Sequence, residues 1–425
     1  MSVAGALWSR RREQPLLVII SVVTVCTLVV WPVVDALLNT IDAIHSSPYG
    51  FNDFGVYSLT VEAWLDGEPI YVENEDGGYH GSFLYPPFVL PLFYPFARLG
   101  FEAGPVLFGT LSLFLLWVGI EGVAETFGAR LSAPERIVLL FALFGFHPAL
   151  WDFKWAQVST LLAALLSFSY LAHDRGEQSY EGSTYLSGVL TTVGSAVKLF
   201  YATAGAHLLR DHKRFGSAVA TAGALLVGSL LVFGVSTHRA YLDVLTWGKG
   251  WGTAQHPPVE WQTAYYRPFY LVDQLIASLG IALPNVWIVS ATILGVLGVI
   301  ALSLAARDEP AAARPTFALG VAVVPLLAPR AYTHDLVVLL LPAVLLLGIE
   351  LEREDGLPWV PVLAILLVHF HSPGTKLVIH ALSDADAVLL QPGVYGSFLL
   401  VGLAAARLAE YASFRRITPA ESDPS

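Results

Sequence analysis

The feature that most constrains this chain is a series of apolar runs, each continuous over roughly 15 to 25 residues. Runs of this length suit helices that cross a bilayer, and they lack the alternating pattern of outer-membrane strands. Because 55% of the residues are hydrophobic and only 13% are charged, the chain is too apolar for a soluble globule. We therefore predict an all-α polytopic membrane protein with about 11 to 13 transmembrane helices.

Arginines beside these runs orient the chain, since cytoplasmic loops are enriched in Lys and Arg. Three of them, Arg10 to Arg12, precede the first run, and no small-residue cleavage site follows it. We interpret that run as a retained span with a cytoplasmic N-terminus, not as a cleaved signal peptide. The expected spans and part-spans are residues 15–38, 85–99, 103–123, 136–150, 156–172, 184–209, 216–235, 285–305, 315–329, 333–349, 358–370 and 388–407.

The loops predict one membrane domain, residues 1–410, followed by a short cytoplasmic tail, 411–425. Two polar and aromatic inserts, 35–84 and 236–284, are expected on the extracytoplasmic face. In the first insert, aromatic and aliphatic residues recur at helical spacing from Asp53 onward, which predicts a helix along the membrane interface with Asp53 at its N-terminal end. In the second, a short apolar segment is expected to lie on the membrane.

Charge and cysteine content exclude several classes of function. The net charge is −11 with only five lysines, which argues against nucleic acid as a partner and resembles the acidic surfaces of halophilic proteins. The single cysteine, Cys26, lies in the first apolar run, so a disulfide framework or a thiol metal site is excluded.

Lys198 lies in the middle of the apolar segment 184–209. At the bilayer centre a lysine costs roughly 2.5–3.5 kcal/mol on insertion scales. The segment is therefore either a hairpin of two short helices with Lys198 at its outward tip, or one straight helix with Lys198 facing a wet cavity. Both interpretations direct Lys198 into protein or water rather than lipid.

On this topology, an unusual number of polar side chains gathers on the outer face. A carboxylate there could take the proton from a sugar hydroxyl, cations could neutralise a leaving lipid phosphate, and apolar helices could hold the lipid tail. The residues in question are Asp53, Lys154, Gln157, Lys198, Gln262, Arg267, Arg330, His334 and Asp335.

Each candidate also has a structural interpretation. Asp53 is equally well explained as a helix cap, and Lys198 as one half of a structural ion pair. Interface anchoring or snorkelling would explain the other basic candidates, Arg267, Arg330 and His334. Solvated loops are the expected setting of His80 and His256, and of Glu73, Glu75 and Asp76, for which the alternative is a metal ligand.

Several motifs occur in a fixed order: Asp53 and Tyr57 before Trp64-Leu65-Asp66-Gly67-Glu68-Pro69-Ile70-Tyr71, then Tyr85-Pro86-Pro87, Trp155-Ala156-Gln157, the segment Ser195–Phe200 around Lys198, Trp261-Gln262-Thr263 with Arg267, and Tyr332-Thr333-His334. Together they resemble glycosyltransferase family 87, the polyprenyl-phosphate-mannose-dependent α-mannosyltransferases of the GT-C superfamily. The sequence departs from the family pattern at Ala156, where the family has glycine, and lacks the usual proline near Lys198.

The resemblance implies a GT-C-type fold and an inverting transfer of a hexose, by default mannose, from a polyprenyl- or dolichyl-phosphate donor. The acceptor would be a hydroxyl of a lipid or glycan on the extracytoplasmic face. Because the leaving group is a lipid monophosphate, side-chain cations can replace a metal, and we expect no cofactor. The implied roles are general base for Asp53, donor-phosphate binding for Lys198, Arg330 and His334, and pocket lining for Tyr57, Tyr85, Gln157, Gln262 and Arg267.

Two other classes of function fit parts of the sequence. A secondary transporter of a sugar or lipid-linked substrate would also have broken helices and an intramembrane lysine, although no paired halves are visible. A non-catalytic membrane scaffold would need neither Lys198 nor an interfacial acid.

Overall fold

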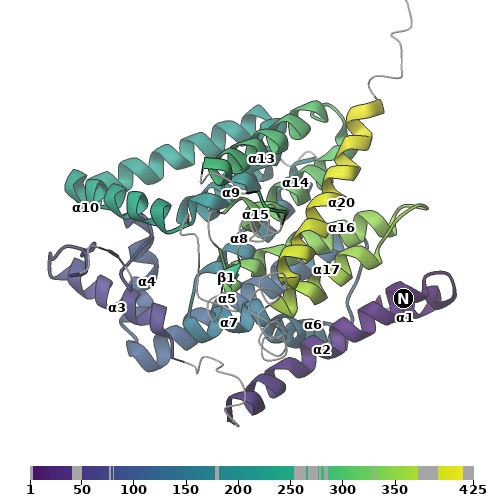
Figure 1. Cartoon of the computed structure of the whole chain (residues 1–425), viewed down its shortest axis with the longest axis horizontal. Coiled ribbons are helices and arrows are strands. Elements are labelled where there is room, and N and C mark those ends of the chain that lie inside the picture. The colour runs from purple at the N-terminus through teal and green to yellow at the C-terminus, as the bar shows by residue number, and fades with distance from the viewer. Residues whose placement is uncertain are drawn as a thin grey trace, which may run out of the picture.

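The computed structural model describes residues 3–40, 50–75, 78–79, 81–177, 181–252, 265–266, 276, 279–281, 286–328, 331–371 and 391–414. Helices dominate this part of the chain (Figure 1). Its strands are β1 (Tyr265–Tyr266) and β2 (Ala331–Tyr332), which pair antiparallel with Tyr265 opposite Tyr332. The all-α prediction is confirmed, and this short ladder joins the second insert to the segment that carries His334.

Five helices within the described ranges are long and apolar enough to cross a membrane, and a bent pair makes a sixth candidate. They agree with the expected spans that begin at residues 15, 103, 216, 333 and 388. The predicted total of 11 to 13 crossings stays a prediction. The five are α2 (Pro15–Thr40), α5 (Gly100–Glu125), the part of α10 from His212 to Trp247, η5 (Thr333–Leu339) with α16 (Leu340–Leu351), and α20 (Pro392–Phe414).

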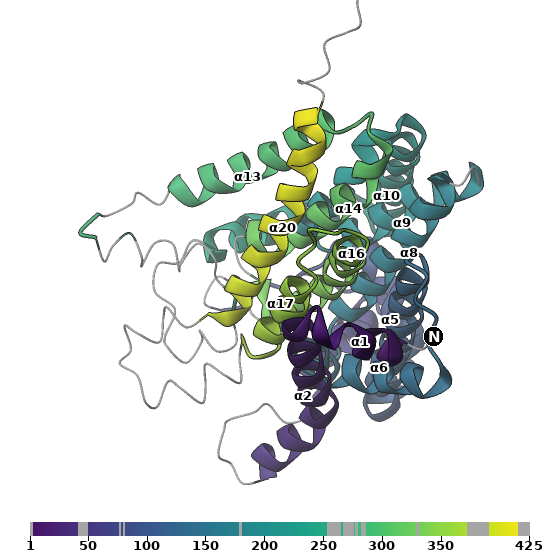
Figure 2. The same cartoon turned by 90° about the vertical axis from the view of Figure 1, so that its right-hand side faces the viewer.

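Shorter helices complete the bundle. Figure 2 shows α16 near its middle, with α8 and α9 on one side and α17 and α20 on the other. The remaining elements are α1 (Val3–Ser9), η1 (Arg10–Arg12), α3 (Asn52–Leu65), η2 (Pro87–Val89), α4 (Leu90–Ala97), α8 (Ser159–Glu177), α9 (Glu181–Val197), η3 (Leu199–Arg210), α13 (Val286–Ala305), η4 (Pro310–Ala312), α14 (Ala313–Ala322), α15 (Val324–Leu327) and α17 (Trp359–His369).

The expected span 136–150 is not one helix. It divides into α6 (Ala133–Gly145) and α7 (His147–Trp155), which meet at an angle of 65°. Pro148 lies in the first turn of α7, where its missing N–H is tolerated, and Phe146 before it is extended. Gly145 lets α6 pack closely against α2, because the Cβ of any other residue there would lie 1.8 Å from the Leu28 carbonyl oxygen. The sequence interpretation missed this break, and it places α7 beside the site described below.

The helix breaks at Lys198, as expected if the segment 184–209 forms two short helices rather than one straight helix. Helix α9 ends at Val197, Lys198 is extended with φ −126° and ψ 105°, and η3 begins at Leu199. The two helical elements contact each other, and the Ser195 hydroxyl donates across the break to the Tyr201 carbonyl oxygen at 3.1 Å. Lys198 therefore lies at the turn between two short helices, not within a straight one.

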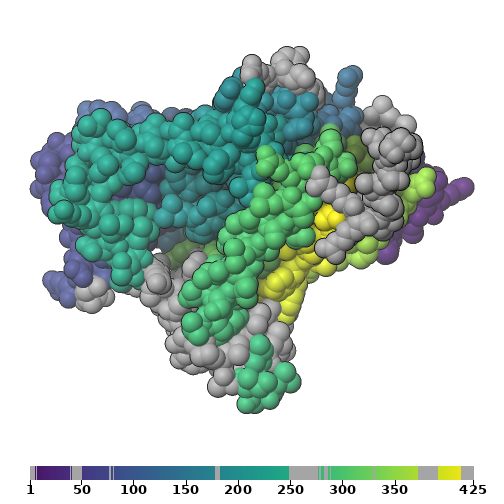
Figure 3. Space-filling model, turned by 90° about the horizontal axis from the view of Figure 1, so that it is seen from above, coloured from purple at the N-terminus to yellow at the C-terminus, as the bar shows by residue number. Residues whose placement is uncertain are grey.

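Helix α10 is longer than expected. The expected span 216–235 ends where the second insert begins, but α10 extends from His212 to Gly252 through a kink at Gly234, where φ is 75°. His238 spans this kink, with one ring nitrogen 2.8 Å from the Gly234 carbonyl oxygen and the other 2.9 Å from the Ser229 hydroxyl. Figure 3 shows α10 in teal across one face of the molecule, with α13 beside α20. The first part of the second insert is thus helical.

Candidate active site

Asp53 lies in the first turn of α3, as the sequence predicts, but it does not cap that helix. Phe51 precedes the helix in a left-handed conformation with φ 45°, and no side-chain hydrogen bond caps the end. The Asp53 carboxylate instead accepts a hydrogen bond from Nε2 of Gln157, in the link between α7 and α8. Of the two interpretations of Asp53, capping is therefore the one that the geometry disfavours.

A chain of hydrogen bonds fixes the orientation of Gln157. The Tyr85 hydroxyl donates to Oε1 of Gln157 at 2.8 Å, so the amide nitrogen is the end that faces Asp53. The Tyr57 hydroxyl lies 3.2 Å from the Tyr85 hydroxyl and extends the chain along α3. Three predicted pocket residues, Tyr57, Tyr85 and Gln157, thus meet at Asp53.

The surroundings of Asp53 favour a carboxylate that exchanges a proton near neutrality. Burial raises its pKa from 3.8 to about 6, against the opposing effects of the Gln157 hydrogen bond and the positive charge of Lys198. A group with this pKa is mostly ionised at pH 7 and can accept a proton with little loss of driving force. Such values are typical of catalytic carboxylates.

Lys198 occupies the other side of the site and is almost fully buried. Its ammonium group donates to Oδ1 of Asp335 at 2.5 Å and to the Ser159 hydroxyl at 2.9 Å. Ser159 in turn donates to the same Asp335 oxygen at 2.9 Å. An ammonium group has three N–H donors, and these contacts use two of them.

His334 lies beside this ion pair. Its Nε2 atom is 3.8 Å from Oδ1 of Asp335, and its ring stacks on Tyr332 at 5.2 Å with an interplanar angle of 6°. Asp335 also accepts the Tyr332 backbone N–H at 2.9 Å, which holds the start of η5. The structure therefore brings two of the predicted phosphate-binding residues, Lys198 and His334, to a common carboxylate.

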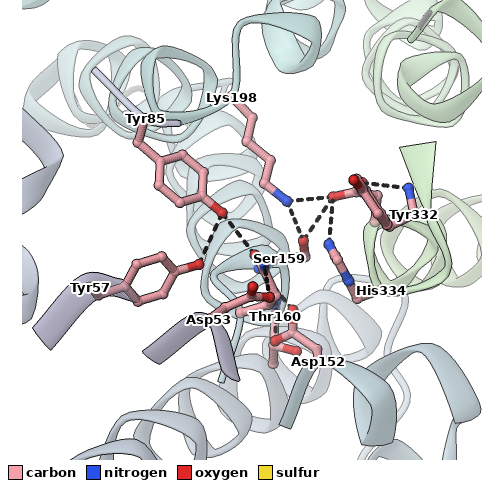
Figure 4. A network of polar contacts seen from close by, with 11 residues as sticks. Asp53, Tyr57, Tyr85, Asp152, Ser159, Thr160, Lys198, Tyr332 and His334 are labelled. Carbon is pink, nitrogen blue, oxygen red and sulfur yellow. Dashed lines mark hydrogen bonds and ion pairs between the residues drawn. The ribbon is translucent and has the colours of Figure 1, made fainter. Parts of the chain in front are cut away.

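Asp152 is a buried acid that the sequence interpretation did not single out. Its two carboxylate oxygens accept the backbone N–H groups of Ser159 and Thr160, each at 3.1 Å, and so cap the N-terminus of α8. Figure 4 shows Ser159 beside Lys198 and His334, with Tyr57 and Tyr85 on the opposite side of the network. The short link between α7 and α8 thus connects the acid to the cation.

Several predicted residues do not join the site. Lys154, expected among the outer-face cations, is buried in an ion pair with Asp35 of α2 at 2.5 Å. Gln262, Arg267 and Arg330 lie outside the described residues, as do Asp76, His80 and His256. Glu73 and Glu75 are exposed, as expected. Within the described ranges no three His, Cys, Asp or Glu side chains form a metal-binding cluster.

Fold and site together define a multi-span helical membrane protein in which a partly buried acid, Asp53, and a largely buried cation, Lys198, both lie at the N-terminal end of α8. The chain belongs to glycosyltransferase family 87, whose family model matches residues 83–329. That range includes Tyr85, Gln157 and Lys198 but not Asp53 or His334.

A Mycobacterium tuberculosis protein, a polyprenol-phosphate-mannose-dependent alpha-(1-2)-phosphatidylinositol mannoside mannosyltransferase, is 28% identical over 222 residues. The alignment covers 48% of this chain and 47% of that protein, which is about half of each. Two crystal structures of ArnT from Cupriavidus metallidurans are also similar, one in the apo state at 14% identity and one bound to undecaprenyl phosphate at 16%. For both, the TM-score is 0.34, with 85% of this chain and 73% of ArnT covered.

Proposed function

We propose that this protein is an inverting membrane glycosyltransferase that moves a hexose, in the first instance mannose, from a polyprenyl- or dolichyl-phosphate donor to an acceptor hydroxyl. Membership of glycosyltransferase family 87 supports the class of reaction. The donor and the sugar are inferred from the name of the mycobacterial relative. The acceptor is a lipid or glycan at the bilayer surface, and nucleic acid is not a partner.

The observation that carries the proposal is the arrangement of Asp53 and Lys198. An acid with a raised pKa lies within electrostatic reach of a largely buried ammonium group. The acid is hydrogen-bonded to Gln157 in the link between α7 and α8, and the ammonium group to Ser159, the first residue of α8. Transfer of a sugar from a lipid phosphate needs these two groups, one for the acceptor proton and one for the leaving phosphate.

The reaction is a single displacement at the anomeric carbon. The acceptor oxygen forms a bond to that carbon while the bond from the carbon to the phosphate oxygen breaks, and its electron pair leaves with the lipid phosphate. Asp53 takes the acceptor proton, and one base suffices for inversion. Lys198 meets the phosphate with the N–H that Ser159 and Asp335 leave unused, and His334 lies beside it. With these side chains in place, we propose that catalysis needs no metal.

The charge distribution along the helices supports an extracytoplasmic site. Ser159 begins α8 and Arg175 lies in its last turn, while Lys198 precedes η3 and Arg210 ends it. Basic residues therefore lie at the ends of these helices opposite the site, and such residues are enriched on the cytoplasmic side. We accordingly assign both termini to the cytoplasm and Asp53 to the outer surface.

The test uses membranes that contain the full chain, incubated with radiolabelled polyprenyl-phosphate mannose or polyprenyl-phosphate glucose. Transfer of label from one donor to an extractable lipid or glycan is expected, and it should be lost in Asp53→Asn. Asp66→Asn is the matched control, because Asp66 is exposed and lies at the opposite, C-terminal end of the same helix from Asp53. Near-normal turnover by Asp53→Asn, with the control also active, would overturn the assignment of the base.

A secondary transporter remains the second candidate, favoured by the buried Lys198–Asp335 pair at the broken element between α9 and η3. In proteoliposomes a transporter would exchange labelled sugar or lipid across the bilayer without forming a new glycosidic bond. Such exchange, undiminished in Asp53→Asn, would favour the transporter over the enzyme.

A further inference from the structure

One buried ion pair has no part in the chemistry proposed above. Asp35 of α2 and Lys154 of α7 lie 2.5 Å apart, and their side chains are 4% and 1% exposed. Asp35 falls inside an apolar helix that is a candidate membrane span. Ionisable residues at such positions are costly and mark functional sites. A pair of apolar side chains would hold the two helices together at least as well.

Lys154 lies in the last turn of α7, and the backbone around it contacts the elements that carry the site. Its backbone carbonyl accepts the N–H of Phe51 at 3.0 Å, which places the start of α3 and therefore Asp53. Two residues before it, Asp152 caps α8 and so fixes Ser159, a partner of Lys198.

The start of α3 depends on this support. Phe51 has a φ of 45°, a conformation that a bulky L-residue adopts only when its surroundings impose it. Its ring packs against Phe101 and Phe153, the second of which is the residue before Lys154 in α7. A shift of α7 would therefore move the Phe51 backbone and the Asp53 carboxylate with it.

Helix α7 is not a straight continuation of α6. It joins α6 through a bend of 65° at Phe146, so the covalent connection alone does not fix its direction. Asp35 links α7 to the long first span by a directional, buried charge pair. Apolar contacts tolerate sliding, whereas a buried pair is satisfied only at one separation.

On the basis of the proposed function, we propose that Asp35 and Lys154 are positioning residues: their ion pair fixes α7 against α2 and thereby sets the distance between the Asp53 carboxylate and the donor phosphate at Lys198. Neither side chain touches the reacting atoms. A misplacement of a catalytic group by 1 Å reduces turnover by up to about a hundredfold. Loss of the pair should consequently lower kcat more than it weakens donor binding.

The decisive variant is the double replacement Asp35→Leu with Lys154→Met, which removes both charges and leaves neither unpaired. Its control is Glu350→Leu with Arg407→Met, because Glu350 and Arg407 form a second largely buried pair, 2.7 Å apart, between α16 and α20. Each full-length protein is reconstituted in vesicles of native lipid extract and given radiolabelled polyprenyl-phosphate mannose. Transfer rates are divided by the amount of protein that elutes as a monodisperse peak before reconstitution.

We expect the Asp35/Lys154 double variant to lose about tenfold to a hundredfold in kcat while its donor KM changes less than about threefold. The Glu350/Arg407 control should keep kcat within about twofold of the wild type, whatever its stability. A wild-type kcat in the Asp35/Lys154 variant would overturn the positioning role and leave the proposed function intact. Absence of transfer by the wild type would overturn the proposed function, and the positioning role with it.

A second variant covers the case in which the double replacement does not fold. Asp35→Asn keeps the size of the side chain and an oxygen that accepts from Lys154, but it removes the charge. We expect about a threefold to tenfold loss of kcat with donor KM retained. A merely structural pair would instead lower the yield of folded protein and leave its kcat unchanged, which would refute the inference.

Discussion

Replacement of Gln157 by leucine tests whether this residue lowers the pKa of the proposed general base, Asp53. Gln157 donates a hydrogen bond to the Asp53 carboxylate and lowers the pKa of that group, which burial holds at about 6. A hydrogen bond to an ionised group contributes about 1.5–3 kcal/mol, and each pKa unit corresponds to about 1.4 kcal/mol. Without Gln157 the pKa of Asp53 should therefore rise by about one unit or more.

The sign of the effect on activity follows from the role of the carboxylate. A general base works only when ionised, so activity is present above its pKa and is lost as the pH falls through it. The wild type should lose activity below a pH of about 6. With a pKa of about 7, the ionised fraction at pH 6 falls from about one half to about one tenth, and at pH 8.5 both proteins are almost fully ionised.

The assay is the pH dependence of kcat/KM for polyprenyl-phosphate mannose in reconstituted vesicles. We expect Gln157→Leu to lose about fivefold at pH 6 and to approach the wild type at pH 8.5. Gln14→Leu, at the far end of the first span, is the control and should leave the profile unchanged. An equal loss at every pH would mean that Gln157 does not act through the pKa of Asp53, and the reasoning would fail.

Three further predictions follow from other parts of the structure. Ala156 has a φ of 53°, so Ala156→Gly should change the free energy of unfolding by less than about 1 kcal/mol, whereas the β-branched Ala156→Val should destabilise by about 2 kcal/mol or more; thermal unfolding of the purified proteins checks both. Transfer should withstand EDTA, since in the proposed mechanism the Lys198 ammonium group meets the phosphate, and inhibition reversed by Mg²⁺ or Mn²⁺ would contradict this. Tyr85→Phe should raise the pH at which activity is lost by less than Gln157→Leu does, because it removes only the group that orients the amide.

Local features of the sequence predicted the elements that hold Asp53 and Lys198. Helical spacing from Asp53 onward predicted α3. The cost of a lysine in an apolar segment predicted either a break at Lys198 or a straight helix with Lys198 facing a wet cavity, and the structure has the break between α9 and η3. The family pattern has glycine at position 156, where this chain has Ala156. The structure explains that preference, because the residue there ends α7 in the left-handed conformation, which glycine adopts without strain.

The partners of these residues were not predictable, because they are remote in sequence. Asp35 and Lys154 are separated by 119 positions, and Lys198 and Asp335 by 137. Lys154 was grouped with the outer-face cations because topology places it there, but only three-dimensional packing shows that it pairs with α2. The kink of α10 was missed for a different, local reason: Gly234 interrupts the apolar run without ending the helix.

The central claim is that Asp53 and Lys198 divide the reaction between them, one acting on the acceptor proton and the other on the donor phosphate. Equilibrium binding of polyprenyl phosphate to purified Asp53→Asn and Lys198→Met tests it most directly, with single-turnover transfer measured on the same samples. Asp53→Asn should bind the lipid with wild-type affinity and transfer no sugar, whereas Lys198→Met should lose binding by about tenfold or more. Unchanged binding by Lys198→Met, or sugar transfer by Asp53→Asn, would contradict the account.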